Sequence, residues 1–194
     1  MKNTDYDRIA ESWHAMRKEL PPKDRELFNF FMASLSPGSH VLDLGCGTGL
    51  MARELCDQGF SVTGVDASEK LLAIARKAVP KATLLCHRIE EYVPGSDVDA
   101  VIVWDCLFHL PREIHPHILE KIYQSLPEGG SAILTSGGSE VDIPPFTDFM
   151  CDVEFFYDSL TVGALKALCG EIGFTIKRFV VLNEIGRASC RERV

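Results

Sequence analysis

The stretch VLDLGCGTGL, residues 41–50, joins a short apolar run to three glycines within five positions, and it constrains the fold more than any other segment. The apolar run has the length and composition of a buried parallel strand. Residues 50–58, which follow the glycines, have a helical pattern that ends at Gly59. A glycine loop between a strand and a helix lies at the carboxyl edge of a parallel sheet, where doubly wound proteins bind their ligands.

The spacing of the glycines excludes two common phosphate-binding loops. A P-loop needs a lysine directly after its last glycine, and none is present. A dinucleotide loop needs a third glycine where Leu50 stands, because the pattern here is Gly45-x-Gly47-x-Gly49. Asp43 also places a carboxylate beside the loop, which would repel a pyrophosphate and attract an ammonium or sulfonium group. The loop therefore favours a cationic ligand, and a NAD-dependent oxidoreductase is kept as the weaker alternative.

Strand and helix patterns alternate along the chain. The predicted strands are residues 41–44, 60–66, 82–87, 98–104, 131–136 and 174–182, and the predicted helices are residues 6–18, 23–35, 50–58, 68–77, 116–125 and 161–172. Residues 137–160 are expected to be irregular. This alternation predicts an α/β fold, a Rossmann-like, doubly wound and mainly parallel sheet with helices on both faces.

Composition limits the partners of the chain. A chain of 194 residues with 46% hydrophobic and 25% charged residues has the composition of one soluble domain. It has no signal-peptide pattern, no long apolar run and no CxxC pair among its seven cysteines, so we expect a cytoplasmic protein without a membrane segment. The net charge of −8 argues against nucleic acid as a partner. The oligomeric state is left open.

Four motifs occur in an order that resembles the class I S-adenosylmethionine-dependent methyltransferases. They are VLDLGCGTG, VTGVDAS, VDAVIVWDCLFHLP and LPEGGSAILT, within residues 41–135. The flanking stretches YDRIAESWH and DSLTVGALKALCGEIGF resemble the small-molecule branch near the ubiquinone- and menaquinone-biosynthesis enzymes. The resemblance implies S-adenosyl-L-methionine as the cofactor and direct displacement of its methyl group onto a small-molecule acceptor. A non-catalytic cofactor-binding protein stays as an alternative.

The same resemblance implies a set of cofactor-binding residues. The glycine loop would wrap the methionine moiety, and Asp66 would accept both ribose hydroxyls. The expected residues are Asp43, Gly45, Cys46, Gly47, Gly49, Asp66, Ala67, Arg88, Ile89, Asp105 and Cys106. Arg88 stands where the family often has an acid for the adenine, so Glu90, Glu91 or the backbone at Ile89 would take that part.

Several other side chains have both a functional and a structural interpretation. His109 is a candidate catalytic base or a structural histidine. No metal site is expected, because His115 and His117 are two residues apart and do not share a helix face. Three candidates belong either to a lid over the cofactor or to a helix packed on the sheet edge, namely Tyr6, Trp13 and Arg17. Five aromatic residues belong either to the wall of the acceptor pocket or to the core, namely Phe146, Phe149, Phe155, Phe156 and Tyr157.

The C-terminal stretch IGRASCRERV, residues 185–194, differs in character from the rest of the chain. Its codons can be written as a common short-read sequencing adapter translated in frame, and a natural basic tail is the alternative. We therefore interpret residues 1–184 as one methyltransferase domain, with a helical lid at 1–36 and a Rossmann-like core at 37–184, and 185–194 as an adapter-derived tail. The family fold has a final antiparallel strand between the fifth and sixth. We expect this chain to lack it, because the tail has little apolar alternation.

Overall fold

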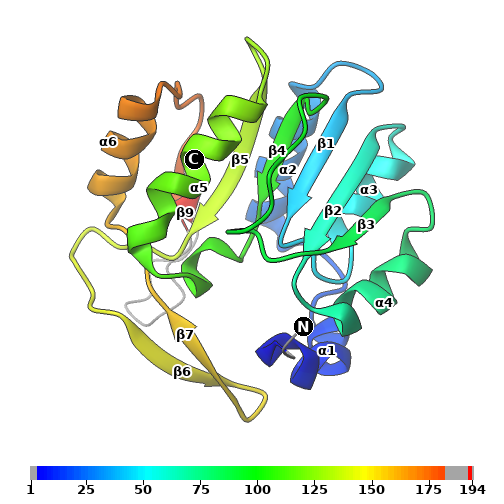
Figure 1. Cartoon of the computed structure of the whole chain (residues 1–194), viewed down its shortest axis with the longest axis horizontal. Helices are drawn as coiled ribbons and strands as arrows, with labels where there is room; N and C mark the ends of the chain where they lie inside the picture. The colour runs from blue at the N-terminus through cyan, green and yellow to red at the C-terminus, as the bar shows by residue number, and fades with distance from the viewer. Residues whose placement is uncertain (1–3, 182–191, 194) are drawn as a thin grey trace.

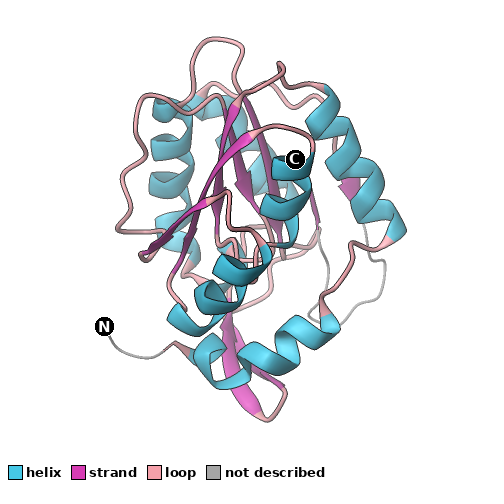
Figure 2. Ribbon diagram, turned by 90° about the vertical axis from the view of Figure 1, so that its right-hand side faces the viewer, coloured by secondary structure: helices cyan, strands magenta, loops and turns pink. Residues whose placement is uncertain are grey.

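The computed structural model describes residues 4–181 and 192–193, and its main body is an open parallel sheet between two layers of helices (Figure 1, Figure 2). The parallel strands are β1 (His40–Leu44), β2 (Ser61–Asp66), β3 (Thr83–Cys86), β4 (Ala100–Val103) and β5 (Ser131–Ser136). They pair in the order β3-β2-β1-β4-β5, so the direction of winding reverses at β1. The predicted Rossmann-like, doubly wound α/β fold is confirmed.

Six α-helices connect and cover the strands. They are α1 (Asp5–Met16), α2 (Pro22–Ala33), α3 (Leu50–Asp57), α4 (Glu69–Ala78), α5 (His115–Ser125) and α6 (Val162–Ile172), with short 3-10 turns η1 (Leu107–His109) and η2 (Arg112–Ile114) before α5. Each helix lies within a few residues of its predicted position. The hydroxyl of Ser68 accepts a hydrogen bond from the backbone N–H of Leu71, so it caps α4 as its sequence position predicts.

The sheet has a hydrophobic core on each face, because successive side chains of a strand point to opposite sides. Val41 packs with Phe28 of α2 and with α3 on one face. Leu42 packs with Ile118 of α5 and with α6 on the other face. Since both faces are covered, the strands are nearly all apolar, and the polar residues collect where the strands end.

A β-hairpin occupies the segment between β5 and α6, which the sequence pattern predicts as irregular. Strands β6 (Phe146–Met150) and β7 (Val153–Tyr157) pair antiparallel and form a separate two-stranded sheet at the bottom of Figure 1. Their two-residue turn has Cys151 at φ 50° and Asp152 at φ 60°. Such left-handed residues give the twist that a tight hairpin needs, but Cys-Asp lacks the usual Asn-Gly signal, so the hairpin was not predicted.

The far edge of the main sheet also differs from the prediction. Strand β8 covers only Val180–Val181 rather than residues 174–182, and a two-residue strand β9 (Glu192–Arg193) pairs antiparallel with both β5 and β8. The family's final strand, which this chain is expected to lack, is thus represented by two residues only, whose backbone groups can form ladder hydrogen bonds whatever their side chains are. Residues 182–191 and 194, which hold most of the tail, lie outside the described residues.

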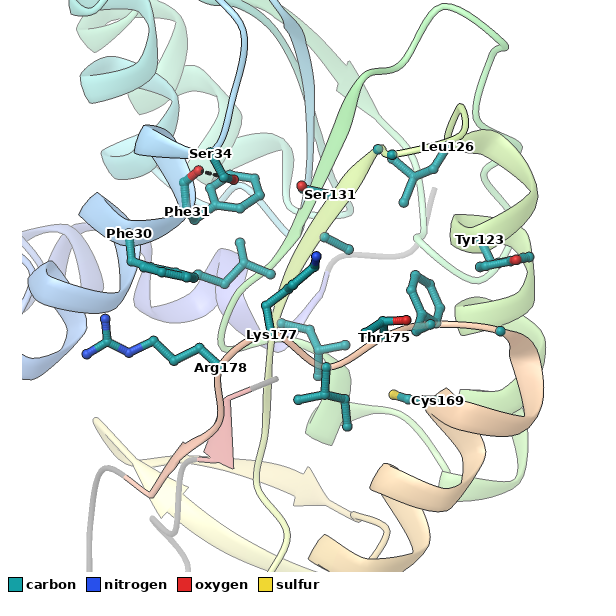
Figure 3. A pocket seen from close by; sticks show the side chains of 18 of the residues that line it. Phe30, Phe31, Ser34, Tyr123, Leu126, Ser131, Cys169, Thr175, Lys177 and Arg178 are labelled. Atoms are coloured by element: carbon teal, nitrogen blue, oxygen red, sulfur yellow. Dashed lines mark hydrogen bonds between the residues drawn. The ribbon is translucent and has the colours of Figure 1, made fainter.

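A cavity of about 820 Å³ separates β5 from the segment before β8 (Figure 3). Phe30 and Phe31 of α2 line it on one side, together with Ser34 directly after the helix. Thr175 and Lys177, from the segment that was predicted as a strand, line it on the other. Strand β9, which lies between β5 and β8, pairs over only two residues at the end of β5, and the cavity lies along Ser131–Leu134. Most of the segment therefore has no neighbouring strand to pair with among the described residues.

Within the described part of the chain, every helix is too short or too polar to cross a bilayer.

Candidate functional site

The carboxyl ends of β1, β2 and β4 bring three aspartates and the glycine loop around one small cavity. The cavity has a volume of about 80 Å³. Seven of the predicted cofactor-binding residues line it, namely Asp43, Gly45, Cys46, Gly47, Asp66, Asp105 and Cys106. Gly49, Ala67, Arg88 and Ile89 do not line it, and neither does His109. Six further residues line it and were not predicted, namely Leu20, Thr48, Leu50, Met51, Leu71 and Trp104. Thr48, Leu50 and Trp104 lie within the quoted stretches, whereas the other three have no local signal.

The glycines of the loop are needed for two different reasons. A Cβ at Gly45 would come within 2.6 Å of the Cβ and Sγ atoms of Cys106, so the packing of β1 against the end of β4 excludes a side chain there. A Cβ at Gly47 would meet only the indole nitrogen of Trp13, at 3.9 Å. Gly47 has φ 55°, a left-handed conformation that suits glycine. The protein's own packing thus requires Gly45, whereas Gly47 keeps the loop open toward the cavity.

Asp43 is a buried carboxyl group whose hydrogen bonds are incomplete. It is buried, and its Oδ2 atom has no hydrogen-bond partner among the described residues. Burial, helped by the nearby charge of Asp66, raises the pKa of Asp43 to about 7. A buried carboxylate without a partner is unfavourable, and a cation in the cavity would relieve it.

Asp66 holds the glycine loop in place. Its Oδ2 accepts a hydrogen bond from the backbone N–H of Gly47 at 2.8 Å, and its Oδ1 accepts one from the N–H of Ser68 at 2.8 Å. Burial raises the pKa of Asp66, and these hydrogen bonds oppose the rise. A carboxylate has about four acceptor positions, so each oxygen can still accept a hydrogen bond from a hydroxyl group of a ligand.

Helix α1 closes the cavity from outside. The guanidinium of Arg17 forms an ion pair with the carboxylate of Asp105 and lies 5.1 Å from the centre of the Trp13 ring. Asp105 has φ 53°, and its N–H donates to the hydroxyl of Thr135 at 2.6 Å. Tyr6, Trp13 and Arg17 all line the cavity, so in this conformation the helix fills space that a ligand would need.

The base of α1 is anchored to the N-terminus of α4. Asp7 is buried, and its Oδ1 accepts hydrogen bonds from the hydroxyl of Ser68 at 2.7 Å and from the N–H of Lys70 at 3.1 Å. Burial raises the pKa of Asp7, but these hydrogen bonds outweigh burial and leave the pKa below its usual value. A carboxylate at a helix N-terminus is also favoured by the helix dipole.

His109 lies outside the cavity wall and contacts the lid through Tyr6. Its Nδ1 is 2.9 Å from the carbonyl oxygen of Phe156, and its Nε2 is 2.9 Å from the hydroxyl of Tyr6. A carbonyl oxygen only accepts, so Nδ1 carries the proton and Nε2 accepts from the Tyr6 O–H. Burial lowers the pKa of His109, which favours the neutral ring with Nε2 unprotonated.

The aromatic cluster divides between the site and the surface. The rings of Phe155 and Tyr157 lie 5.6 and 4.9 Å from the His109 ring. Phe146 stacks on Tyr157 at 5.3 Å. Phe149, by contrast, is 69% exposed on the hairpin, and Phe156 is also exposed. Burial therefore separates residues that the sequence pattern could only group together.

The two cysteines of the site are neutral packing residues. Burial raises the pKa of both the Cys46 and the Cys106 thiols well above the usual range. Cys106 donates its S–H to the carbonyl oxygen of Leu44 at 3.2 Å.

His115 is a buried histidine whose Nε2 lies 3.0 Å from the carbonyl oxygen of Leu110. Among the described residues there is no group of three or more His, Cys, Asp or Glu side chains that could hold a metal ion.

A Rossmann-like sheet with an open glycine loop and three carboxylates at its carboxyl edge favours a cationic ligand over a pyrophosphate. A family profile described as "Methyltransferase domain" matches residues 41–130. The chain belongs to the class I S-adenosylmethionine-dependent methyltransferases.

Relatives and solved structures agree with this assignment. The chain is 30% identical over 106 residues to a ubiquinone biosynthesis O-methyltransferase of Pseudomonas aeruginosa (strain LESB58). The matched region covers 51% of this chain and 44% of that protein. The chain is 33% identical over 159 residues to an arsenite methyltransferase of Halobacterium salinarum, covering 73% and 39%. The matched part therefore spans less than half the length of these relatives. The fold matches a crystal structure of an S-adenosylmethionine-dependent methyltransferase from Methanosarcina mazei with a TM-score of 0.73 and 19% identity, over 90% of this chain and 95% of that one.

Proposed function

We propose that the chain binds S-adenosyl-L-methionine and transfers its methyl group to a small-molecule acceptor in the cytoplasm. The observation that carries the proposal is the buried Asp43, whose Oδ2 lacks a partner among the described residues and which lines the same cavity as Asp66 and Asp105. The carboxylates that line this cavity would attract a cation. They would repel the negatively charged pyrophosphate of a dinucleotide.

The residues at the carboxyl edge fit the chemical parts of this cofactor. Asp43 and Asp105 would accept hydrogen bonds from its ammonium group, and the open face of Gly47 would admit its methionine moiety. The free acceptor positions of Asp66 would take its ribose hydroxyls. Ala67, Arg88 and Ile89 would lie against the adenosine, with Gly49 shaping the loop and Cys46 and Cys106 packing beneath it.

The lid has to exchange its contacts when a ligand enters. A site of about 80 Å³ is far smaller than the roughly 300 to 1,000 Å³ of ordinary ligand pockets. The Arg17–Asp105 ion pair therefore has to open, which leaves Arg17 to bind a carboxylate of the ligand and Asp105 to bind an ammonium. Residues 1–36 thus act as the lid over a core of 37–184, and 185–194 is proposed to be a foreign tail.

S-adenosylmethionine supplies a methyl group that its positive sulfur already activates. The chain would align the acceptor and exclude water, for which the aromatic rings around His109 are suited. His109 would remove a proton from an acceptor that arrives protonated, through Nε2. The hydrogen bond from Nδ1 to the carbonyl of Phe156 supports this role, because it leaves the free lone pair of the ring on Nε2. The acceptor would replace the Tyr6 hydroxyl, which donates to Nε2 in this conformation.

The acceptor is proposed to be a small molecule. The acidic net charge of −8 and the aromatic surroundings of His109 support it, since a nucleic acid would need a basic face. The names of the two relatives refer to a quinone pathway and to arsenite, so they do not define the acceptor atom.

Calorimetric titration of the chain with S-adenosylmethionine, S-adenosylhomocysteine and NAD tests the proposal. We expect both sulfur-containing ligands to bind and NAD not to bind. Binding of NAD alone would refute it. A methyl-transfer screen with labelled cofactor over phenols, amines, thiols and activated carbon acids then separates an enzyme from a cofactor-binding protein, which would give no labelled product with any acceptor.

A further inference from the structure

The loop that follows β3 is held by a lysine of helix α5. Lys121 lies in the middle of α5, and its Nζ donates to the carbonyl oxygens of Glu90 at 2.8 Å, Tyr92 at 2.9 Å and Ile89 at 3.5 Å. An ammonium group has three donors, so the three carbonyls use all of them. Lys121 therefore ties the loop to α5 at three points.

Other contacts place this loop next to the proposed cofactor site. The N–H of His87 donates to the carbonyl of Asp66 at 3.0 Å, which joins the start of the loop to the end of β2. The carbonyl of Arg88 then accepts from the N–H groups of Glu91 and Tyr92, at 3.1 and 3.0 Å. These bonds form a compact turn directly beyond the aspartate that is expected to bind the ribose.

The turn aims its polar backbone at Lys121 and its apolar side chains at the core. Ile89 packs against the hydrophobic cluster that contains Ile118 and Ile122 of α5. Arg88, in contrast, is exposed and pairs its guanidinium with Glu90 at 2.5 Å. Helix α5 thus holds the loop through an ammonium and a hydrophobic contact.

We propose that Lys121 is a positioning residue for the adenine, because it holds the backbone of Ile89–Tyr92 in the shape that receives the base. This rests on the proposed function, since it assumes that the site binds an adenosine-containing cofactor. Lys121 acts only through the loop. Removing its ammonium would leave three carbonyls without their donor, and the loop would rearrange to bring them to water.

The test is the variant Lys121→Met, which keeps the length of the side chain and removes the ammonium. Two ligands are titrated, S-adenosylhomocysteine and S-ribosylhomocysteine, which has the same amino-acid and ribose parts but no adenine. We expect the dissociation constant of S-adenosylhomocysteine to rise about tenfold, which corresponds to about 1.4 kcal/mol. The dissociation constant of S-ribosylhomocysteine is expected to stay unchanged, which a general loss of stability would not produce.

Lys77→Met serves as the matched control, because Lys77 is an exposed lysine of α4 away from this loop. It should bind both ligands as the wild type does. If Lys121→Met does not fold, as judged by circular dichroism, Lys121→Gln is used, since its amide keeps two donors without the charge and should give a smaller selective loss. Equal losses for both ligands, or no loss in a folded variant, would overturn the role of Lys121. Failure of the wild type to bind S-adenosylhomocysteine would instead overturn the proposed function.

Discussion

At the scale of a single residue, the burial of Asp43 destabilises the folded protein when its carboxyl group is ionised. Its pKa is raised to about 7 by burial and by the charge of Asp66, whereas a free aspartate titrates near 4. The folded state therefore binds a proton that the unfolded state releases between about pH 4 and pH 7. The contribution of Asp43 to the free energy of unfolding therefore falls as the pH rises through that window and stays low above it.

Asp43→Asn should remove this cost. At pH 8 we expect the free energy of unfolding to increase by roughly 4 kcal/mol relative to the wild type, and at pH 4 the two proteins should be nearly equal. The same variant should bind S-adenosylmethionine more weakly at pH 8, because the amide cannot neutralise a cation. Urea unfolding at both pH values and calorimetry would measure this. A variant that is less stable at pH 8 would contradict the buried-charge explanation.

Asp66→Ala should weaken cofactor binding by about 2 kcal/mol, the cost of losing hydrogen bonds to a charged group. The loop bond from Gly47 to Asp66 is lost as well, so a moderate loss of stability accompanies it. Titration with S-adenosylhomocysteine measures the affinity. Unchanged affinity in a folded variant would show that Asp66 does not bind the ribose.

His109→Ala should lower kcat more than it raises the KM for the cofactor, if His109 acts as a base. Tyr6→Phe is the companion variant, since it removes only the hydroxyl that donates to Nε2 and keeps the ring. It should leave the rate within a few-fold of the wild type. Small and equal effects on kcat and KM in His109→Ala would assign His109 a structural role.

At the scale of elements, α1 connects the lid to the cofactor loop and to the hairpin. Tyr6 packs edge-on against Trp13 and Phe155, with ring centres 5.3 and 4.9 Å apart, and Ile9 is buried against the same cluster. Asp7 anchors the start of the helix on α4. The lid can therefore open at its Arg17 end while its first turn stays attached.

Asp7→Ala should release this anchor and speed the dissociation of S-adenosylhomocysteine several-fold, with stability lowered by about 1 to 3 kcal/mol because Ser68 and Lys70 lose an acceptor. Asp5→Ala is the matched control, an exposed acid in the same first turn. Stopped-flow fluorescence of Trp13 and Trp104 would follow dissociation. Equal rates in the two variants would mean that Asp7 does not anchor the lid.

At the scale of the whole molecule, the sheet is unequal at its two sides. Strand β1 has parallel partners on both edges, whereas β8 pairs over only two residues and a large cavity lies between Thr175 and β5. Backbone groups without ladder partners open more readily to solvent.

Amide exchange should therefore show weak protection for residues 174–180 and strong protection for residues 41–44. The measurement is exchange with peptide-level detection, in the absence of ligand. Equal, strong protection in both segments would contradict this account of the sheet edge. An S-adenosylhomocysteine complex is the control, since it should raise protection in residues 4–17 without changing residues 174–180.

The resemblance to the methyltransferases implied that Asp43, Asp66 and Asp105 belong to one site. The α/β class and the helix and strand positions from 5 to 136 could be predicted from the sequence pattern alone. These follow from local rules, because apolar periodicity, caps and glycines act over a few residues and parallel strands end at one edge. The lid contact between Tyr6 and His109, the tie from Lys121 to the loop of Ile89 and the hairpin of residues 146–157 came only from the tertiary structure.

The same limit explains the failed prediction of a long sixth strand. The apolar pattern of residues 174–182 is compatible with a strand, but only Val180 and Val181 find a partner in the described structure. Hydrogen-bond partners far away in sequence, and the burial that raises the pKa of Asp43, depend on which elements pack together. Local pattern therefore decided the elements, and packing decided which polar groups meet, which charges are buried and which edges stay open.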